Sequence, residues 1–552
     1  MYDGKGNMMV STRGADGSWW VYTYDLYGQL VSGRRYWADS RPVAGQQFEY
    51  RHDAIGNRTA GSWGGDELGQ SLRWSTNTVN RLNQYTSRTV PGYVGVSGEA
   101  AEAATVTLWW GSNEWARAIQ QGRYWYGEAL VNNATGSVWV VITNLGVVRG
   151  QPDRVQSETG SAFVAQTPET LIHDLDGNLA RDGRWMYYWD AENRLTRVIT
   201  VAGPSSSFRR VEWKYDAWGR RTRQTTYVLS NGVWQVVKDL KFVSDPELFG
   251  RHVAELNATN NSLVRAYIWG LDLSGTLDAA GGVGGLLWVR AATGPAAGTH
   301  FVCYDGNGNV WNLVSATTGT ETARYEYGPF GEPLRLSGPA ARFNPFRFST
   351  KRSEDFTSLV LYEHRAYNPT LGRWLSRDPI GEGGGAHLHA FVANEPPGDI
   401  DTDGRFMGIK CPFCGQWYHG WHECRPNTEP PSLVMGESCM RFSDIASAIA
   451  LANRALRESE CAKWFRDHGS HGERYRVRCH GNCKFVCLFG GTAWTYAGWS
   501  AIGLCPGNLT RYTDSGIAAL LIHEVAHHYC PVIGGESCAN HAMEACEPFL
   551  TR

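Results

Sequence analysis

The sequence predicts a mainly β protein, in which a long scaffold of β-hairpins is followed by a small, cysteine-rich α+β domain. The 64 glycines, 24 tryptophans and 25 tyrosines among 552 residues favour tight turns and aromatic strands over long helices. The cysteines are distributed unevenly, because twelve of the thirteen lie between Cys411 and Cys546 and only Cys303 precedes them. This change in composition places a domain boundary near residue 405.

A short pattern recurs up to about residue 340. In each copy an aromatic residue or a histidine is followed by an Asp turn, then by Gly or Asn, and then by a returning strand; copies begin at Tyr24-Asp25, His52-Asp53, Trp189-Asp190, Tyr215-Asp216 and Tyr304-Asp305. Asp, Gly and Asn favour tight turns, and flanking aromatic residues pack across strands, so each copy predicts a β-hairpin. One hairpin cannot bury its apolar face, whereas many stacked hairpins can, which predicts a long coiled sheet.

Near the C-terminus the sequence His523-Glu524-Val525-Ala526-His527 lies in a predicted helix that starts at Asp514 or Ser515 and stops near Pro531. Two histidines four residues apart lie on the same face of a helix, where both can bind one Zn²⁺. Glu524 then lies beside the metal. A carboxylate in that position acts as a general base towards the metal-bound water and then as an acid towards a leaving amine, which is the chemistry of peptide hydrolysis.

A catalytic zinc ion needs a third protein ligand and an open position. Glu536, at the start of the next predicted helix, is the first choice for this ligand, and His541 and Glu544 are the alternatives. The motif and the helix after it resemble zincin metallopeptidases, in particular short gluzincin-like toxin domains. This resemblance covers only about the last thirty residues of the chain.

Two aspartates, Asp378 and Asp401, stand 23 residues apart at the junction between the two regions. If folding brings the two carboxylates together, they share a proton, because repulsion between like charges raises one pKa. One carboxyl group can then act as an acid while the other activates water. The alternative is that both carboxylates only close turns.

The cysteine-rich region leaves two interpretations open. Cys411-Pro412-Phe413-Cys414, with His419, His422 and Cys424 after it, has the close spacing of a zinc knuckle. Twelve cysteines is also an even number, which suits disulfides in an oxidising compartment. Disulfides are the preferred interpretation for most of the cysteines, and the Cys411 and Cys414 pair stays open.

Charge and hydropathy limit the partners that the sequence predicts. A formal net charge of -2 gives no reason to expect nucleic acid or an anionic membrane as the main partner. No run of eighteen or more apolar residues predicts a membrane span, and the first residues lack the apolar core of a signal peptide. If the protein is secreted or delivered into a target cell, we expect another route to carry it.

The hairpin pattern resembles the YD repeats of Rhs-type polymorphic toxins. The resemblance extends to the segments Trp269–Leu277 and Ala280–Leu287, and to Phe346–Lys351 with Tyr362, Tyr367-Asn368-Pro369 and Gly372–Gly381, a run similar to the Rhs repeat-associated core. The resemblance implies a hollow β-cocoon that encloses a C-terminal toxic domain. It also implies a protein substrate in the target cell, a cognate immunity protein and a component of a secretion system as partners.

The same resemblance implies that Asp378 and Asp401 form an intramolecular aspartic protease that cuts the chain near Arg405-Phe406. This chain departs from the family pattern, because it has Asp401-Thr402-Asp403-Gly404-Arg405 where the family has Asp-Pro-x-Gly-Leu. The expected domains are therefore a repeat scaffold over 1–340, a core with a self-cleaving junction over 341–405, and a zinc peptidase over 406–552. One alternative is a cell-surface protein for adhesion or carbohydrate binding, with a disulfide-rich C-terminal module that does not catalyse. Another is a C-terminal domain that keeps the same metal site and cleaves something other than peptide bonds.

Overall fold

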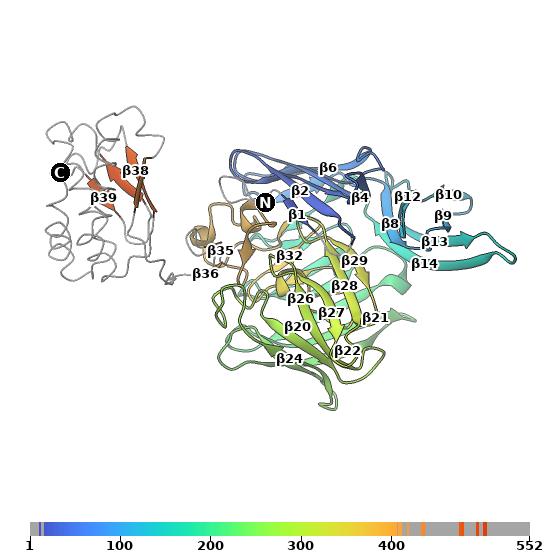
Figure 1. The fold of residues 1–552 in the computed structure, drawn as a ribbon. Coiled ribbons are helices and arrows are strands. Elements are labelled where there is room, and N and C mark those ends of the chain that lie inside the picture. The colour runs from blue at the N-terminus through green and yellow to red at the C-terminus, as the bar shows by residue number, and fades with distance from the viewer. Residues whose placement is uncertain are drawn as a thin grey trace. The chain divides into compact units, whose positions relative to one another are not determined.

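The computed structural model describes residues 10–12, 16–405, 407–410, 417–418, 432–435, 474–479, 493–495 and 501–504. The chain divides into two compact units, one of Met1–Lys410 with Gln416–Gly420 and the other of Cys411–Gly415 with Trp421–Arg552. We call the first the scaffold unit (Figure 1). Strands make up most of its regular structure, which confirms the mainly β prediction. The domain limits at residues 340 and 405 stay predictions.

The first large sheet of the scaffold unit has eight strands in the order β1-β2-β3-β4-β5-β6-β7-β15. Every neighbouring pair is antiparallel. The strands are β1 (Val10–Thr12), β2 (Trp19–Tyr24), β3 (Leu30–Tyr36), β4 (Pro42–His52), β5 (Arg58–Gly64), β6 (Leu72–Val79), β7 (Tyr85–Arg88) and β15 (Glu169–Thr170). In β5 buried and half-buried residues alternate along the whole strand, as the period of a pleated sheet requires.

The second large sheet has fourteen strands in sequence order from β16 to β29 (green to yellow in Figure 1). Such an order arises when each strand pairs with the one before it, as the stacked hairpins predict. The strands are β16 (Ile172–His173), β17 (Leu179–Arg181), β18 (Trp185–Trp189), β19 (Leu195–Thr200), β20 (Arg209–Tyr215), β21 (Arg221–Ser230), β22 (Val233–Ser244), β23 (His252–Asn257), β24 (Leu263–Trp269), β25 (Leu286–Ala291), β26 (Gly298–Tyr304), β27 (Val310–Ser315), β28 (Glu321–Tyr327) and β29 (Pro333–Ser337).

The repeated Asp residues close hairpin turns by one set of hydrogen bonds. Asp305, between β26 and β27, accepts the backbone N–H groups of Asn307 and Asn309 on Oδ1, both at 3.0 Å. Gly308 in this turn has φ +73°, a left-handed conformation that suits glycine. The same two bonds, to the second and fourth residues after the Asp, recur at Asp25, Asp53, Asp190 and Asp216. The hairpins predicted at these five positions are confirmed.

Smaller sheets complete the scaffold unit. Their orders are β10-β9-β13-β14, β11-β12-β8, β30-β31-β32-β33 and β34-β35-β36. The strands are β8 (Tyr93–Glu99), β9 (Thr105–Trp110), β10 (Glu114–Arg117), β11 (Ile119–Gln121), β12 (Tyr124–Leu130), β13 (Val138–Val148), β14 (Arg154–Val164), β30 (Arg352–Ser353), β31 (Val360–Leu361), β32 (Ala366–Asn368), β33 (Arg373–Trp374), β34 (Ile400–Asp401), β35 (Met407–Lys410) and β36 (Trp417–Tyr418). Four 3₁₀ turns are described: η1 (Ser205–Ser207), η2 (Phe348–Thr350), η3 (Gly381–Gly384) and η4 (Val392–Asn394).

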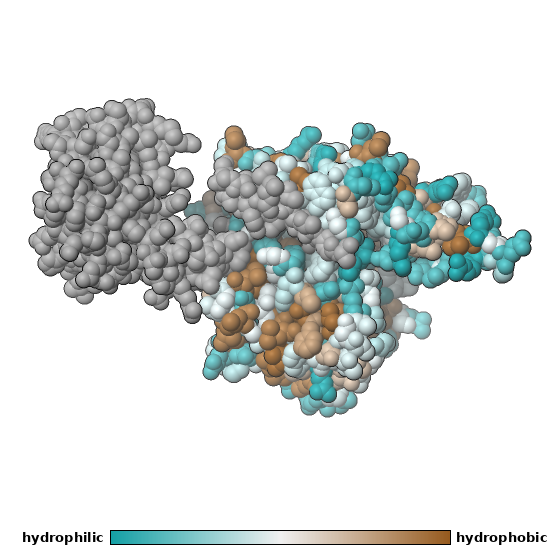
Figure 2. Space-filling model, viewed as in Figure 1, coloured by the Kyte–Doolittle hydropathy of each residue, from teal (hydrophilic) through white to brown (hydrophobic). Residues whose placement is uncertain are grey.

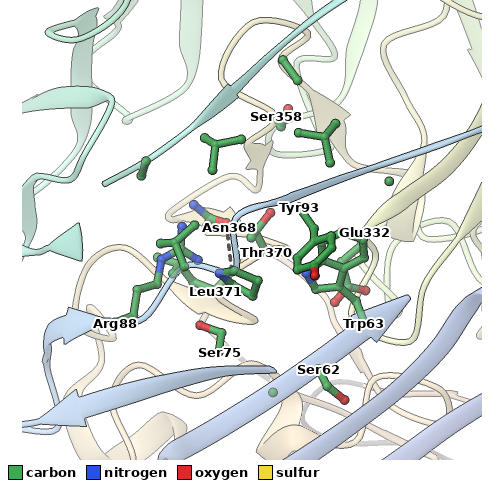
Figure 3. A pocket seen from close by; sticks show the side chains of 18 of the residues that line it. Ser62, Trp63, Ser75, Arg88, Tyr93, Glu332, Ser358, Asn368, Thr370 and Leu371 are labelled. Atoms are coloured by element: carbon green, nitrogen blue, oxygen red, sulfur yellow. Dashed lines mark hydrogen bonds between the residues drawn. The ribbon is translucent and has the colours of Figure 1, made fainter. Parts of the chain in front are cut away.

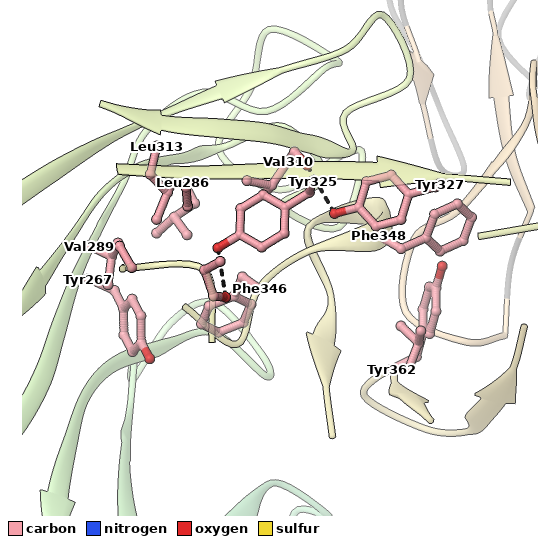
Figure 4. Packing of buried hydrophobic residues seen from close by; sticks show 14 of the residues in the cluster. Tyr267, Leu286, Val289, Val310, Leu313, Tyr325, Tyr327, Phe346, Phe348 and Tyr362 are labelled. Carbon is pink, nitrogen blue, oxygen red and sulfur yellow. Dashed lines mark hydrogen bonds between the residues drawn. The ribbon is translucent and has the colours of Figure 1, made fainter. Parts of the chain in front are cut away.

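Among the described residues, an extensive core lies between the fourteen-stranded sheet and the segment that follows it (Figure 4). Phe346, Phe348 and Tyr362 from the segment pack with side chains such as Tyr267 and Tyr325 from the strands. The Tyr325 hydroxyl donates to the carbonyl oxygen of Ala341 at 3.0 Å, so the polar end of this buried ring is satisfied. The segment after residue 340 thus shares its core with the sheet, and this packing fixes the position of the candidate site.

On the face shown in Figure 2, apolar side chains gather over part of the fourteen-stranded sheet, and elsewhere on that face they are scattered among polar ones. Several of the most exposed lie at the tips of hairpin turns, among them Leu26, Ile55, Leu82, Leu175 and Trp218. A turn tip has no neighbouring strand to cover it, so isolated exposure of this kind is ordinary. Among the described residues, no helix has the length and the apolar character that would let it cross a membrane.

The second unit contains one described sheet, in the order β37-β38-β40-β39. Its strands are β37 (Ser432–Met435), β38 (Arg474–Cys479), β39 (Ala493–Thr495) and β40 (Ala501–Leu504). β38 pairs in parallel with β37 and β40, and β39 pairs antiparallel with β40. The helices predicted for this region lie outside the described residues.

Candidate active site

The two aspartates predicted to cut the chain meet at one arginine. Arg365 directly precedes β32, Asp378 follows β33, and Asp401 ends β34. The Nη2 atom of Arg365 lies 2.8 Å from Oδ2 of Asp378 and 3.4 Å from Oδ2 of Asp401. All three side chains are buried, with 4%, 8% and 3% of Arg365, Asp378 and Asp401 exposed. Folding thus brings together the carboxylates that the sequence places 23 residues apart.

Backbone hydrogen bonds orient each carboxylate. Asp378 accepts the N–H of Ile380 on Oδ1 at 3.0 Å. Asp401 accepts the N–H groups of Gly404 and Asp403 on Oδ1, at 2.6 and 3.1 Å. These bonds occupy the Oδ1 atoms, so the Oδ2 atoms of both carboxylates are the ones that contact Arg365.

Gly384 lies close both to Asp378 and to the residue before the predicted cut. A methyl group built on Gly384 would overlap Oδ2 of Asp378 and would stand 2.8 Å from the carbonyl oxygen of Arg405. Gly384 therefore leaves the space in which the Arg405 carbonyl and the Asp378 carboxylate approach each other. Phe406, on the other side of the predicted bond, lies outside the described residues.

Two cations hold the segment that leads to this carbonyl. The Nε atom of Arg365 donates to the carbonyl oxygen of Gly404, and its guanidinium lies over the ring of Trp374 at 4.2 Å. Lys351 donates to the carbonyl oxygens of Thr402 and Gly281, at 2.7 and 2.9 Å. The backbone from residue 402 to 404 is thus fixed from two sides by buried side chains.

Burial sets the protonation of the pair. It raises the pKa of Asp401 to about 7, with the Arg365 guanidinium opposing this rise and the negative charge of Asp403 adding to it. Burial also raises the pKa of Asp378, again against the effect of Arg365. Burial acts to raise the pKa of Asp403 as well, but the hydrogen bond and charge of Arg405 outweigh it and lower that pKa. Around neutral pH the site can therefore hold a proton on one carboxyl group while a neighbouring one is ionised.

Sequence reasoning found the two aspartates and missed Arg365, Gly384 and Lys351. Arg365 and Asp401 are 36 residues apart, and no periodicity links them. An arginine before a strand and a glycine within Gly383-Gly384-Gly385 are ordinary features of a loop-rich segment. Only the fold shows that they meet the two carboxylates.

A cavity of about 580 Å³ inside the scaffold unit is a second candidate (Figure 3). It has the size of a small-molecule site. Its three acidic groups already make hydrogen bonds within the fold. Glu169 accepts the Arg88 guanidinium and the N–H of Gly183, Asp182 accepts the Tyr187 hydroxyl at 2.7 Å, and Glu332 accepts the N–H of Phe330 at 2.9 Å. The Asp378 and Asp401 pair, which lies beside a predicted scissile carbonyl, is the better candidate for catalysis.

The predicted zinc site lies outside the described residues. This holds for His523, Glu524, His527 and Glu536, for the alternative ligands, and for the cysteines of the 411–424 cluster. Within the part of the chain that the structure describes, no group of three or more His, Cys, Asp or Glu side chains could hold a metal ion.

Parts of this chain are similar to a known protein family and to several known proteins. The teneurin YD-shell family model matches residues 284–381. The tRNA nuclease WapA of Bacillus subtilis (strain 168) is 28% identical over 246 residues, which cover 44% of this chain and 9% of that protein. The toxin subunit YenC1 of Yersinia entomophaga is 26% identical over 231 residues, 40% of this chain and 22% of that protein.

Among solved structures, that of TcdB2-TccC3 aligns with a TM-score of 0.35 and 16% sequence identity, over 73% of this chain and 19% of that one. The chain spans less than a quarter of the length of these relatives. The matched family and the sequence relatives are those expected for stacked YD hairpins. The scaffold of this chain is therefore similar to the YD-repeat scaffolds of these toxin proteins.

Proposed function

We propose that the scaffold unit is the self-cleaving carrier of a C-terminal toxic domain, and that it cuts its own chain between Arg405 and Phe406. The observation that supports this proposal is the buried pair of aspartates on Arg365, with the Arg405 carbonyl beside Asp378. The carboxylates of the hairpin turns also bind backbone N–H groups of their own turns, and the shared contact with Arg365 distinguishes Asp378 and Asp401 from them.

In the proposed reaction Asp378 takes a proton from a water molecule, whose oxygen attacks the carbonyl carbon of Arg405. Asp401, which keeps its proton up to a pH of about 7, gives that proton to the nitrogen of Phe406. The carbon–nitrogen bond then breaks. The products are a carboxyl group on Arg405 and a free amine on Phe406. Arg365 is a positioning residue, because it holds both carboxylates and the Gly404 carbonyl.

The test is expression of the full chain with Asp378→Asn or Asp401→Asn, with Asp176→Asn at an exposed turn carboxylate as the control. Electrophoresis and N-terminal sequencing are expected to show a fragment that starts at Phe406 in the wild type and in the control. The uncut chain is expected in both site variants. A fragment that persists in either of them would exclude the aspartic pair.

For the released domain we propose zinc-dependent peptide hydrolysis. The donor set of His523, His527 and Glu536, two imidazoles and a carboxylate, is one that Zn²⁺ favours in hydrolases. Zinc, when bound there, supplies a water of lowered pKa and polarises the scissile carbonyl. Glu524 would act beside the metal as the general base and then as the acid towards the leaving amine. His541 and Glu544 stay alternatives for the third ligand.

The matched assay compares the full chain with its His523→Ala and Glu524→Gln variants. Metal analysis is expected to find one zinc per chain in the wild type and in Glu524→Gln, and less in His523→Ala. Hydrolysis of a protein substrate is expected in the wild type alone. Because one relative is named a tRNA nuclease, tRNA is the second substrate. Cleavage of tRNA and not of protein would replace the peptidase proposal.

We propose that the protein is delivered to a target cell with a component of a secretion system, that its substrate there is a protein, and that a cognate immunity protein protects the producer. The same zinc and hydrolysis assay separates this function from adhesion or carbohydrate binding, for which neither metal nor turnover is expected.

A further inference from the structure

The residues after the predicted cut form a strand on the strand that carries Asp401. β35 pairs antiparallel with β34, with Met407 opposite Asp401 and Gly408 opposite Ile400. β35 also pairs with β36, with Ile409 opposite Tyr418. All three strands lie in the scaffold unit, although β35 and β36 follow the predicted cut. The predicted cut therefore lies in the turn of a hairpin whose first strand bears a catalytic group.

We propose that the scaffold recognises the segment downstream of the cut by β-strand addition to β34, through its backbone. The substrate class is then an extended, proline-free peptide at positions 407–410, with little demand on its side chains. This inference rests on the proposed self-cleavage and states what that reaction recognises.

The register of this pairing has a direct consequence for the reacting carbonyl. A slip of one residue moves a strand by about 3.3 Å and turns its side chains to the other face. The Arg405 carbonyl oxygen stands 2.8 Å from the methyl position on Gly384, beside Asp378. Because Arg365 and Lys351 hold residues 402–404, a slip of β35 along β34 would change the span left for the two residues of the predicted bond, and with it the place of the Arg405 carbonyl. The pairing of β35 with β34 therefore contributes to which peptide bond faces the carboxylate.

Side chains hold the chain on the N-terminal side of the predicted bond, and backbone pairing holds it on the C-terminal side. On the N-terminal side, Arg365 binds the Gly404 carbonyl and Lys351 binds the Thr402 carbonyl. On the C-terminal side, the described contact is backbone pairing with Ile400 and Asp401. Backbone pairing is lost when proline replaces a residue whose N–H belongs to the ladder, and it tolerates most other side chains.

The test uses the full chain with proline or alanine at positions 407 and 408, made by timed cell-free synthesis. One of Met407→Pro and Gly408→Pro is expected to slow the appearance of the Phe406 fragment by at least about tenfold, the effect of losing a positioning hydrogen bond. Met407→Ala and Gly408→Ala, which keep the N–H groups, are expected to slow it by less than about threefold. Glu429→Pro, next to Pro430 and Pro431, is the control for proline itself.

Rapid cutting in both proline variants, or equal loss in the alanine variants, would overturn the inference. Hydrogen exchange of the 407–410 amides separates this failure from failure of the cleavage proposal. It is measured in the Asp378→Asn background, where no cut is expected. If the amides are protected and lose protection in the proline variants, but the wild type is not cleaved, the strand pairing stands and the self-cleavage proposal fails. If the wild type is cleaved but these amides are unprotected, the self-cleavage proposal stands and the strand-pairing inference fails.

Discussion

At the scale of single residues, the candidate site depends on a carboxyl group that keeps its proton near neutral pH. Burial and the nearby negative charge of Asp403 raise the pKa of Asp401. The charge of Arg365 and the N–H groups of Gly404 and Asp403 lower it. The balance leaves the pKa of Asp401 at about 7. A free aspartate has a pKa of about 3.9, so the folded chain binds this proton more tightly than the unfolded chain.

The first prediction is that self-cleavage slows as pH rises through about 7, because the proton of Asp401 is then lost. Between pH 6 and 8.5 the rate is expected to fall about thirtyfold. This proton also stabilises the folded chain. Its contribution to the free energy of unfolding is complete below a pH of about 4, the pKa in the unfolded chain, and is lost as the pH rises to the folded-state pKa of Asp401, about 7. The measurement is the rate of fragment appearance in timed cell-free synthesis at several pH values. A constant rate across this range would contradict the assignment of the proton to Asp401.

The second prediction concerns Gly384. Gly384→Ala is expected to slow cleavage by at least about tenfold, because the new methyl group overlaps Asp378 Oδ2 and crowds the Arg405 carbonyl. Gly383→Ala is the matched control, since its methyl group would meet only Ile380, at 3.9 Å. Thermal unfolding of both variants checks the fold. Equal cleavage in the two variants would show that the carbonyl does not react from this position.

Residue types explain which members of the site the sequence could predict. Asp378 and Asp401 come from segments that resemble a known junction, so they were found. Arg365 and Gly384 act only through contacts that folding creates, and a guanidinium or a glycine in a loop has many other uses. The zinc ligands His523 and His527 follow a local helical spacing, and they stay a prediction.

At the scale of elements, the turn of each YD hairpin is a local structure, and this made it predictable. The Asp side chain bonds to N–H groups two and four residues ahead, so the information lies within five positions. The segment after residue 340 is different. His387 bonds to Asn57 across 330 residues of sequence, and Arg373 bonds to the Asn83 carbonyl across 290. Local sequence patterns do not predict contacts between residues so far apart in the chain.

The third prediction tests this attachment of the segment to the turns. The Nδ2 atom of Asn57 donates to Asp53 at 3.0 Å and to Asn83 at 3.1 Å, and its Oδ1 atom lies 2.7 Å from Nε2 of His387. Asn57→Ala is expected to lower the free energy of unfolding by about 1–3 kcal/mol, because it removes the three hydrogen bonds that the buried Asn57 side chain makes to half-buried partners. Asn113→Ala, at an exposed turn, is the control and is expected to change it by less than about 0.5 kcal/mol. Chemical denaturation measures both, and equal values would contradict the linking role of Asn57.

At the scale of the whole molecule, every described group of the candidate site belongs to the scaffold unit. Arg365, Asp378, Gly384 and Asp401 lie within its range, and so do β35 and β36 beyond the predicted cut. Both large sheets pack against the segment after residue 340, which carries the two aspartates. We therefore expect the proposed cut to need the sheets and not the second unit.

The fourth prediction follows from this division. A chain that ends at Gly420 keeps β34, β35 and β36 and is expected to cut itself after Arg405 at the rate of the full chain. Mass spectrometry would detect the peptide of residues 406–420, and Asp378→Asn in the same short chain is the control that stays whole. Thermal unfolding establishes that the short chain has folded, with the transition of the scaffold in the full chain as the reference. A folded short chain that stays uncut would mean that the second unit contributes to the reaction, and the aspartates on Arg365 would then be insufficient as its catalytic centre.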